Sequence, residues 1–219
     1  MDIFKNVKTI FFDYDGTLHD SMNIYKPALN KAYSYLVEEG LAEPRDLKDE
    51  EIKYWLGFNS IDMWAKFMPE LSKEMQTKAR KMVGAEMKSL VEQKKAALYE
   101  GALETLEYLK SKGYRLVFVS NCSHYYKDMH NEAFNLDKYF EELACAQQYE
   151  YIPKYEFLAK VMTKYPKNMV IVGDRHHDMK AGKMNNIYTI GCDYGFGLEG
   201  ELDEADIIIK DIRELKEYL

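Results

Sequence analysis

Short apolar runs recur along the chain, and each ends near polar or glycine residues. The runs span residues 9–12, 116–119, 143–146, 169–172, 187–190 and 207–209. Segments of helical period separate most of them; in GALETLEYLKSKG the leucines recur every three residues before a C-cap glycine, Gly113. Buried strands that alternate with helices are typical of a mainly parallel sheet with helices on both faces. The pattern predicts an α/β fold with a Rossmann-like core.

The stretch between the first two runs, from about Ser21 to about Lys94, has no convincing strand pattern. Its apolar residues follow helical spacing, in one helix that we expect to open at Pro27 and in another with a methionine-rich face. Roughly 75 residues directly after a strand are too many for a simple connection. We therefore expect an inserted, all-helical subdomain at residues 20–94 and an α/β core domain formed by residues 1–19 and 95–219.

Composition narrows the class of protein. The chain has 219 residues, 47% of them hydrophobic and 31% charged, which is typical of a globular protein with a sizeable core. No apolar stretch approaches the length of a membrane span, and the first residues lack the features of a signal peptide, so we expect a cytoplasmic protein without a membrane partner. The net charge of −7 argues against binding of a nucleic-acid polymer.

Polar and acidic residues follow several of the predicted strands. DYDGT begins at Asp13, SN at Ser120 and GDRHHD at Gly173, while Lys154 follows Pro153. The carboxyl ends of parallel strands form one ligand-binding edge, so we expect these segments to converge there. Asp13 and Asp15 are two residues apart and would face the same place, where two carboxylates repel unless a cation or a proton separates them.

The converging residue types suit the transfer of a phosphoryl group. Several carboxylates make an all-oxygen site for a hard cation, for which Mg²⁺ is the usual choice beside phosphate. Serine, asparagine and lysine side chains donate to phosphate oxygens. An aspartate whose charge is neutralised in this way attacks phosphorus, and a paired acid protonates the leaving oxygen and later deprotonates water.

The segments DYDGTLHDS, VSNC, PKYEFL and VGDRHHDMKAG resemble the four motifs of the haloacid dehalogenase superfamily, in the order and spacing of that family. The resemblance covers essentially the whole chain. It implies that Asp13 is the nucleophile and Asp15 the general acid and base. It also implies that Asp13, the backbone carbonyl of Asp15 and Asp174 hold Mg²⁺, with Asp178 supporting the site.

The same resemblance assigns the phosphoryl group to Ser120, Asn121 and Lys154. Within the superfamily, the helical insertion is similar to the cap of the phosphoglycolate phosphatase-like branch, and YWLGFNSIDMW resembles the loop that such caps dip into the active site. The tip of this loop supplies the candidates for substrate contact: Phe58, Asn59 and Ser60.

Three positions depart from the family pattern. Arg175 follows Asp174 where serine is more usual, His19 stands where an apolar residue is common, and Tyr155 follows Lys154 where proline is common. Charged and imidazole side chains are mostly exposed in proteins, so the sequence favours a surface location for Arg175 and for the five histidines.

The sequence indicates a Mg²⁺-dependent phosphatase for a small phosphorylated metabolite, acting through an aspartyl-phosphate on Asp13. A phosphomutase like β-phosphoglucomutase, or a catalytically idle binding protein with this fold, are the alternatives. A dehalogenase is disfavoured because Asp15 is present. Phosphoglycolate, a nucleotide, a sugar phosphate and pyrophosphate all stay open as substrates, because a handful of cap residues decides specificity. The oligomeric state stays open as well.

Overall fold

A six-stranded parallel sheet forms the centre of the computed structural model, which describes residues 3–219. The strands are β1 (Thr9–Phe12), β2 (Arg115–Ser120), β3 (Glu142–Cys145), β4 (Met169–Gly173), β5 (Tyr188–Cys192) and β6 (Ile207–Ile209). Their order is β3-β2-β1-β4-β5-β6, with β1 between β2 and β4. The six apolar runs in the sequence match these strands closely, and the predicted α/β fold is confirmed.

The helices are α1 (Met22–Glu38), α2 (Asp49–Trp55), α3 (Ser60–Phe67), α4 (Lys73–Glu92), α5 (Ala102–Ser111), α6 (His124–Phe134), α7 (Lys154–Met162), α8 (His176–Met184) and α9 (Leu215–Tyr218). Three short 3₁₀ helices lie at Leu136–Lys138, Ala146–Tyr149 and Ile212–Glu214. The expected C-cap glycine of α5, Gly113, has a positive φ of 87°, a conformation that glycine adopts without strain.

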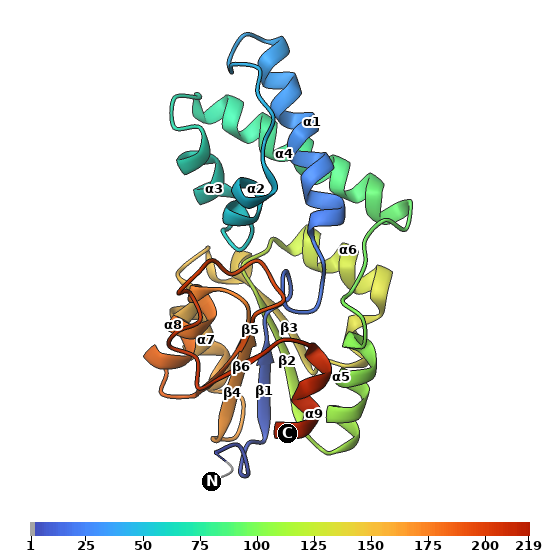
Figure 1. The fold of residues 1–219 in the computed structure, drawn as a ribbon, viewed down its shortest axis with the longest axis vertical. Helices are drawn as coiled ribbons and strands as arrows, with labels where there is room; N and C mark the ends of the chain where they lie inside the picture. Colours follow the sequence, from blue (N-terminus) through green and yellow to red (C-terminus); the bar gives the residue numbers. More distant parts are fainter. Residues whose placement is uncertain (1–2) are drawn as a thin grey trace.

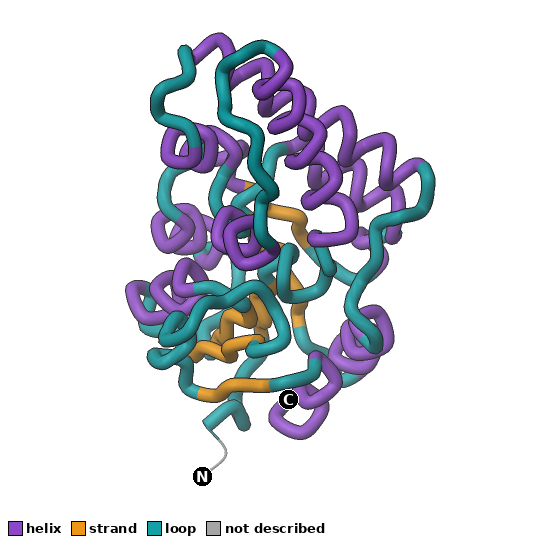
Figure 2. The backbone as a smooth tube through the Cα atoms, turned by 45° about the horizontal axis from the view of Figure 1, so that its top comes forward, coloured by secondary structure: helices purple, strands orange, loops and turns teal. Residues whose placement is uncertain are grey.

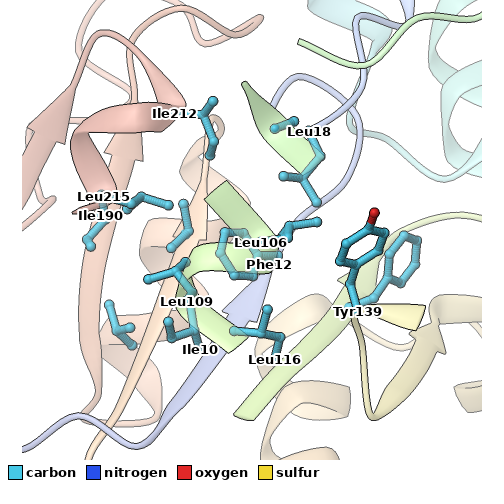
Figure 3. Close-up of a cluster of buried hydrophobic side chains, with 14 of the residues drawn as sticks. Ile10, Phe12, Leu18, Leu106, Leu109, Leu116, Tyr139, Ile190, Ile212 and Leu215 are labelled. Atoms are coloured by element: carbon cyan, nitrogen blue, oxygen red, sulfur yellow. The ribbon is translucent and has the colours of Figure 1, made fainter. Parts of the chain in front are cut away.

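Side chains alternate between the two faces of the sheet, as the period of a strand requires. Ile10 and Phe12 of β1 pack with Leu106 and Leu109 of α5 on one face (Figure 3). Phe11, between them in sequence, packs on the other face in the cluster that α7 and α8 cover. Figure 1 shows these two pairs of covering elements, α5 with α9 and α7 with α8, on opposite sides of the strands.

Helices α1 to α4 stand apart from the sheet, beyond the carboxyl ends of the strands (Figures 1 and 2). They have a core of their own, in which the buried face of α1 packs along α4. The turn between α2 and α3 lies on the side of these helices that faces the sheet (Figure 1). The boundaries expected at 19/20 and 94/95 stay a proposal, which these separate cores support; residues 1 and 2 lie outside the described residues.

The expectation that Pro27 opens the first helix is wrong, because α1 begins at Met22 and Pro27 lies inside it. Proline leaves the carbonyl four residues earlier, on Asn23, without its helical donor. Asn23 is exposed, so water can satisfy that carbonyl, and burial of Ile24 and Tyr25 holds the first turn in place. None of the helices within residues 3–219 has both the length and the apolar character that a membrane span requires.

Candidate active site

The predicted site residues meet at the carboxyl edge of the sheet. Phe12 of β1 is in register with Val172 of β4, so Asp13 and Asp174 follow neighbouring strands closely. Ser120 ends β2 on the other side of β1, and Lys154 is the first residue of α7. The side chains of these four residues are almost fully buried.

Three carboxylates lie around one point in this edge. Asp13, Asp174 and Asp178 each offer an oxygen, and these atoms all lie within 4.8 Å of one another. The Nζ atom of Lys154 lies 2.8 Å from Oδ1 of Asp13 and 2.6 Å from Oδ1 of Asp178. Three carboxylates and one ammonium leave two net negative charges in a buried site. An all-oxygen donor set with that charge fits a hard divalent cation.

The pKa values of these carboxyl groups show that their charged forms are unfavourable without a further cation. Burial, and then the charge of Asp178, raise the pKa of Asp13 to about 7, although Lys154 counteracts this. Burial and the charges of Asp13 and Asp178 also raise the pKa of Asp174 well above its usual value. For Lys154 the two carboxylates outweigh burial and raise the pKa. A cation between the carboxylates would favour their charged forms.

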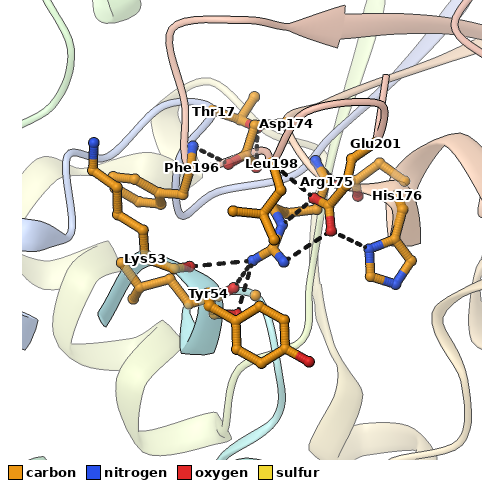
Figure 4. A network of polar contacts seen from close by, with 12 residues as sticks. Thr17, Lys53, Tyr54, Asp174, Arg175, His176, Phe196, Leu198 and Glu201 are labelled. Atoms are coloured by element: carbon orange, nitrogen blue, oxygen red, sulfur yellow. Dashed lines mark hydrogen bonds and ion pairs between the residues drawn. The ribbon is translucent and has the colours of Figure 1, made fainter. Parts of the chain in front are cut away.

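The backbone of the turn after β1 lies so close to Asp174 that a side chain at position 16 would clash with it. A Cβ atom on Gly16 would lie 2.0 Å from Oδ2 of Asp174, and Gly16 has a φ of +78°. The backbone N–H of Phe196 donates to Oδ2 at 2.8 Å, and the Thr17 hydroxyl donates to Oδ1 at 3.4 Å (Figure 4). Glycine at position 16 is therefore needed for the turn after β1 to touch the acidic cluster.

Asp15 lies beside the cluster in a separate hydrogen-bond network. Its Oδ1 accepts from the hydroxyls of Ser21 and Tyr126 and lies 3.0 Å from Nδ1 of His19. Burial would raise the pKa of Asp15, but the contacts with His19, Ser21 and Tyr126 outweigh burial and lower it. Its Oδ2 makes no hydrogen bond within residues 3–219. One carboxylate oxygen is thus anchored, and the other is available.

A cleft of about 520 Å³ opens between the helical subdomain and the sheet edge. Asp13, Asp15 and Ser120 line it from the core, and Phe58 and Ser60 line it from the turn between α2 and α3. The Asn121 side chain also lines it and donates to the Gly57 carbonyl at 2.9 Å. The predicted loop tip therefore lies over the acidic cluster.

Asn59, the third candidate at that tip, has a different position. It does not line the cleft, and its side-chain oxygen accepts from the backbone N–H groups of Ile61 and Asp62, which makes it the N-cap of α3. Substrate contact by Asn59 stays a prediction, and the geometry gives this residue a structural role.

Arg175 is only 1% exposed, so the expected surface location is wrong. Its Nε and Nη2 donate to the carboxylate of Glu201 at 2.6 and 3.1 Å. Its Nη1 donates to the backbone carbonyl of Leu56 and lies 3.4 Å from those of Lys53 and Tyr54 (Figure 4). The guanidinium connects the core to the last turn of α2 in the helical subdomain.

The imidazoles of His19 and His130 are also fully buried, against the expectation from their residue type. The two rings lie 4.6 Å apart, and Nδ1 of His130 lies 2.8 Å from the hydroxyl of Tyr14. Burial, and then the neighbouring His19, lower the pKa of His130 to about 3. These rings form a layer behind Asp15 that the sequence did not indicate.

Comparison with known proteins agrees with this geometry. A sequence model described as haloacid dehalogenase-like hydrolase matches residues 10–192, which span the sheet edge and the helical insertion. The chain belongs to the haloacid dehalogenase-like hydrolases. The resemblance inferred from the four motifs is confirmed, and so is the prediction of a phosphatase-type hydrolase.

The similar proteins and structures share about a fifth to a quarter of their residues with this chain. The chain is 26% identical over 182 residues to pyrophosphatase PpaX of Bacillus thuringiensis (strain Al Hakam), a match that covers 81% of this chain and 79% of the relative. A predicted phosphoglycolate phosphatase from Haemophilus somnus 129pt is 24% identical, with a TM-score of 0.80 and coverage of 96% and 97% of the two chains. CbbY from Rhodobacter sphaeroides in complex with phosphate is 18% identical, with a TM-score of 0.79 and coverage of 95% and 96%. The two structures share the fold of this chain.

Proposed function

We propose that the protein is a Mg²⁺-dependent phosphatase that hydrolyses a small phosphomonoester through an aspartyl-phosphate on Asp13. The observation that carries the proposal is the ion pair between Lys154 and Asp13, which lines the floor of the cleft and lies beside Asp174 and Asp178. The names of the relatives, a pyrophosphatase and a predicted phosphoglycolate phosphatase, support the reaction class. The cytoplasmic location stays a prediction from the sequence.

Mg²⁺ would be held by the carboxylates of Asp13 and Asp174 and by the backbone carbonyl of Asp15, with Asp178 as support. The excess of two negative charges in the cluster supports this assignment. When bound, the cation supplies charge neutralisation that lets a carboxylate approach an anionic phosphoryl group. Magnesium suits such a site because it prefers oxygen ligands and is usually bound by carboxylates together with substrate phosphates.

In the first step an oxygen of Asp13 attacks phosphorus. The phosphorus–oxygen bond to the leaving group breaks, its electron pair stays on the leaving oxygen, and Asp15 gives that oxygen a proton. The negative charge of the bound substrate beside Asp15 favours the protonated carboxyl group that this step needs, against the contacts that lower its pKa. Ser120, Asn121 and Lys154 hold the phosphoryl oxygens while charge develops on them. The free Oδ2 of Asp15 and its position in the cleft support its role in the proton transfer.

In the second step water attacks the phosphorus of the aspartyl-phosphate and gives a proton to Asp15. The bond between phosphorus and the Asp13 oxygen breaks, which releases inorganic phosphate and restores both carboxyl groups. Proton transfer by a positioned carboxyl group contributes about 10² to 10⁴ in rate. The helical subdomain above the cleft limits the water that reaches the intermediate.

A phosphomutase is the second candidate, because one observation favours it. The sequence showed an uncharged loop tip, GFNS, but the cap also presents Arg80 and Lys81 of α4 to the cleft. These cations suit a substrate with phosphate at both ends. A mutase would move the phosphoryl group within a sugar phosphate in the presence of the bisphosphate, and a phosphatase would release it to water.

Phosphate release from small phosphoesters, with Mg²⁺ or with EDTA, tests the proposal. We expect metal-dependent release by the wild-type chain and at least a 1000-fold loss, on the order of the effect of removing a nucleophile, in Asp13→Asn. Asp20→Asn is the matched control, because Asp20 lies in the same segment, DYDGTLHDS, and does not line the cleft. Undiminished release by Asp13→Asn would overturn the assignment of the nucleophile.

A further inference from the structure

The cleft is larger than the smallest substrates of this reaction class require. Its volume of about 520 Å³ lies in the range of roughly 300 to 1000 Å³ that accommodates ligands of drug size. Phosphoglycolate and pyrophosphate carry only a few atoms beyond the phosphoryl group. The remaining space lies between the acidic floor and α4, where the leaving group of a phosphomonoester would extend.

The wall around that space is rich in rings. Trp55 and Phe58 from the α2–α3 region, Trp64 from α3, and Tyr125 and Tyr126 from α6 all line the cleft. The rings of Trp55 and Phe58 lie 5.9 Å apart. Aromatic walls favour a flat apolar group, which they contact over a large area.

Two cations without partners lie on the α4 side of the cleft. Arg80 and Lys81 both line it, and within residues 3–219 neither side chain makes a hydrogen bond or an ion pair. Arg80 acts electrostatically on Tyr151, which lines the cleft from the core. Asp13 and Asp15 at the floor are the sole acids among the lining residues of the described chain, so the upper part of the cleft is positively charged.

The face of α4 that lines the cleft is open at Gly84. Gly84 lines the cleft one helical turn after Arg80, and a Cβ atom built on it would meet nothing within 4 Å. No side chain of residues 3–219 lies within 4 Å of that position. It continues the apolar wall made by Val83 and Met87, which lie on the same helix.

We propose that the substrate is a phosphomonoester whose leaving group combines a ring-sized apolar body with a second anionic group, a carboxylate or a phosphate. The body lies against the aromatic wall and Gly84, and Arg80 and Lys81 bind the second anion. Arg80 and Lys81 are specificity-determining residues in this arrangement. The inference rests on the proposed phosphatase function and names its substrate class.

Four probes separate the two features of the leaving group. Phenyl phosphate has the ring alone, phosphoglycolate the second anion alone, and 4-carboxyphenyl phosphate both. Pyrophosphate has no apolar body, and its second phosphate is joined directly to the first. We expect kcat/KM for 4-carboxyphenyl phosphate to exceed that for each of the others at least tenfold. Replacement of both cations, Arg80→Gln with Lys81→Gln, should lower it about tenfold and change the value for phenyl phosphate less than threefold.

Lys73→Gln is the matched control, because Lys73 is an exposed residue of α4 that does not line the cleft. A binding readout needs no turnover: the two tryptophans of the chain, Trp55 and Trp64, both line the cleft, so intrinsic fluorescence reports its occupancy. In Asp13→Asn, 4-carboxyphenyl phosphate should bind about tenfold more tightly than phenyl phosphate, and the double replacement should remove this difference.

The outcomes distinguish the inference from the function on which it rests. If the wild-type chain releases phosphate from none of the probes, the phosphatase proposal fails, and the fluorescence titration still decides whether the cleft selects a ring with a second anion. If phosphate is released but both phenyl esters react and bind equally, the inference is overturned and the phosphatase stands. Preference for phosphoglycolate or pyrophosphate over both phenyl esters would also overturn it.

Discussion

The buried guanidinium of Arg175 predicts a measurable link between the core and the helical subdomain. Replacement by methionine keeps the length and apolar stem of the side chain and removes its charge and donors. The substitution leaves the Glu201 carboxylate with His176, whose Nδ1 lies 2.8 Å away, and removes the donor to the carbonyls at the end of α2. The Glu201 carboxylate and the Leu56 carbonyl therefore each lose a hydrogen-bond donor.

The magnitude follows from burial on each side. Removing one member of a fully buried ion pair costs about 3 to 5 kcal/mol. The Glu201 side chain is 14% exposed and keeps the contact with His176, so about 2 kcal/mol is appropriate for its part. The lost bond to the Leu56 carbonyl adds about 1 kcal/mol. We expect Arg175→Met to lower the free energy of unfolding by about 3 kcal/mol.

Urea unfolding of Arg175→Met, Glu201→Gln and the double variant measures this directly. The double-mutant cycle should give a coupling energy of about 2 kcal/mol between the two residues. Hydrogen exchange should become faster at the amides of residues 56–60. Arg213→Met is the control, because Arg213 forms exposed ion pairs with Asp211 and Glu100, and its replacement should cost far less than that of Arg175.

A loss below about 0.5 kcal/mol in Arg175→Met, within the range of ordinary surface substitutions, would refute this reasoning. A coupling energy near zero with a large single-variant loss would show that Arg175 stabilises the protein by packing and not by its charge. Unchanged exchange at residues 56–60 would show that the contact with α2 does not hold the turn.

Three further predictions follow from buried groups and from α4. Lys154→Met should lower kcat/KM with Mg²⁺ by about 10² to 10³, because its ammonium contacts Asp13, and a loss below tenfold in a phosphate-release assay would contradict its role. The pKa of His130 is about 3 in the folded protein and near 6.5 in the unfolded chain. Between these pH values the unfolded chain binds more protons, so the free energy of unfolding falls as the pH decreases. From pH 6.5 to 5, the urea-derived stability advantage of wild type over His130→Phe should shrink by about 2 kcal/mol, and a constant difference would contradict the buried neutral imidazole. Gly84→Ala should raise the free energy of unfolding by about 0.5 to 1 kcal/mol, because alanine is the better helix former and its Cβ meets no atom; a loss in urea unfolding would show that the site is crowded.

The strand ends could be predicted because their signals are local. An apolar run of four residues followed by DYDGT contains both the strand and the turn that ends it, and the parallel arrangement then brings distant strand ends to one edge. The placement of Asp13, Ser120 and Asp174 beside one another needed no knowledge of side-chain packing. Their roles stay predictions until the proposed experiments are done.

Burial of the charged side chains could not be predicted, because their partners are distant or carry no sequence signature. Arg175 binds Glu201, 26 residues later, and the backbone carbonyl of Leu56, which any residue at that position would offer. Asp15 receives the hydroxyl of Tyr126, 111 residues away. Residue type alone favours exposure for arginine and histidine, and tertiary contacts override that preference here.

Two residues at the carboxyl edge of the sheet donate hydrogen bonds to the turn between α2 and α3. Asn121, after β2, donates to the carbonyl of Gly57, and Arg175, after β4, donates to that of Leu56. Asp13 follows β1, which lies between these two strands. The turn that carries Phe58 is therefore positioned by neighbours of the acidic cluster itself. Substitution of Arg175, which the proposed reaction does not use, should raise KM for large leaving groups more than for pyrophosphate, because the wall of the cleft moves and the floor does not.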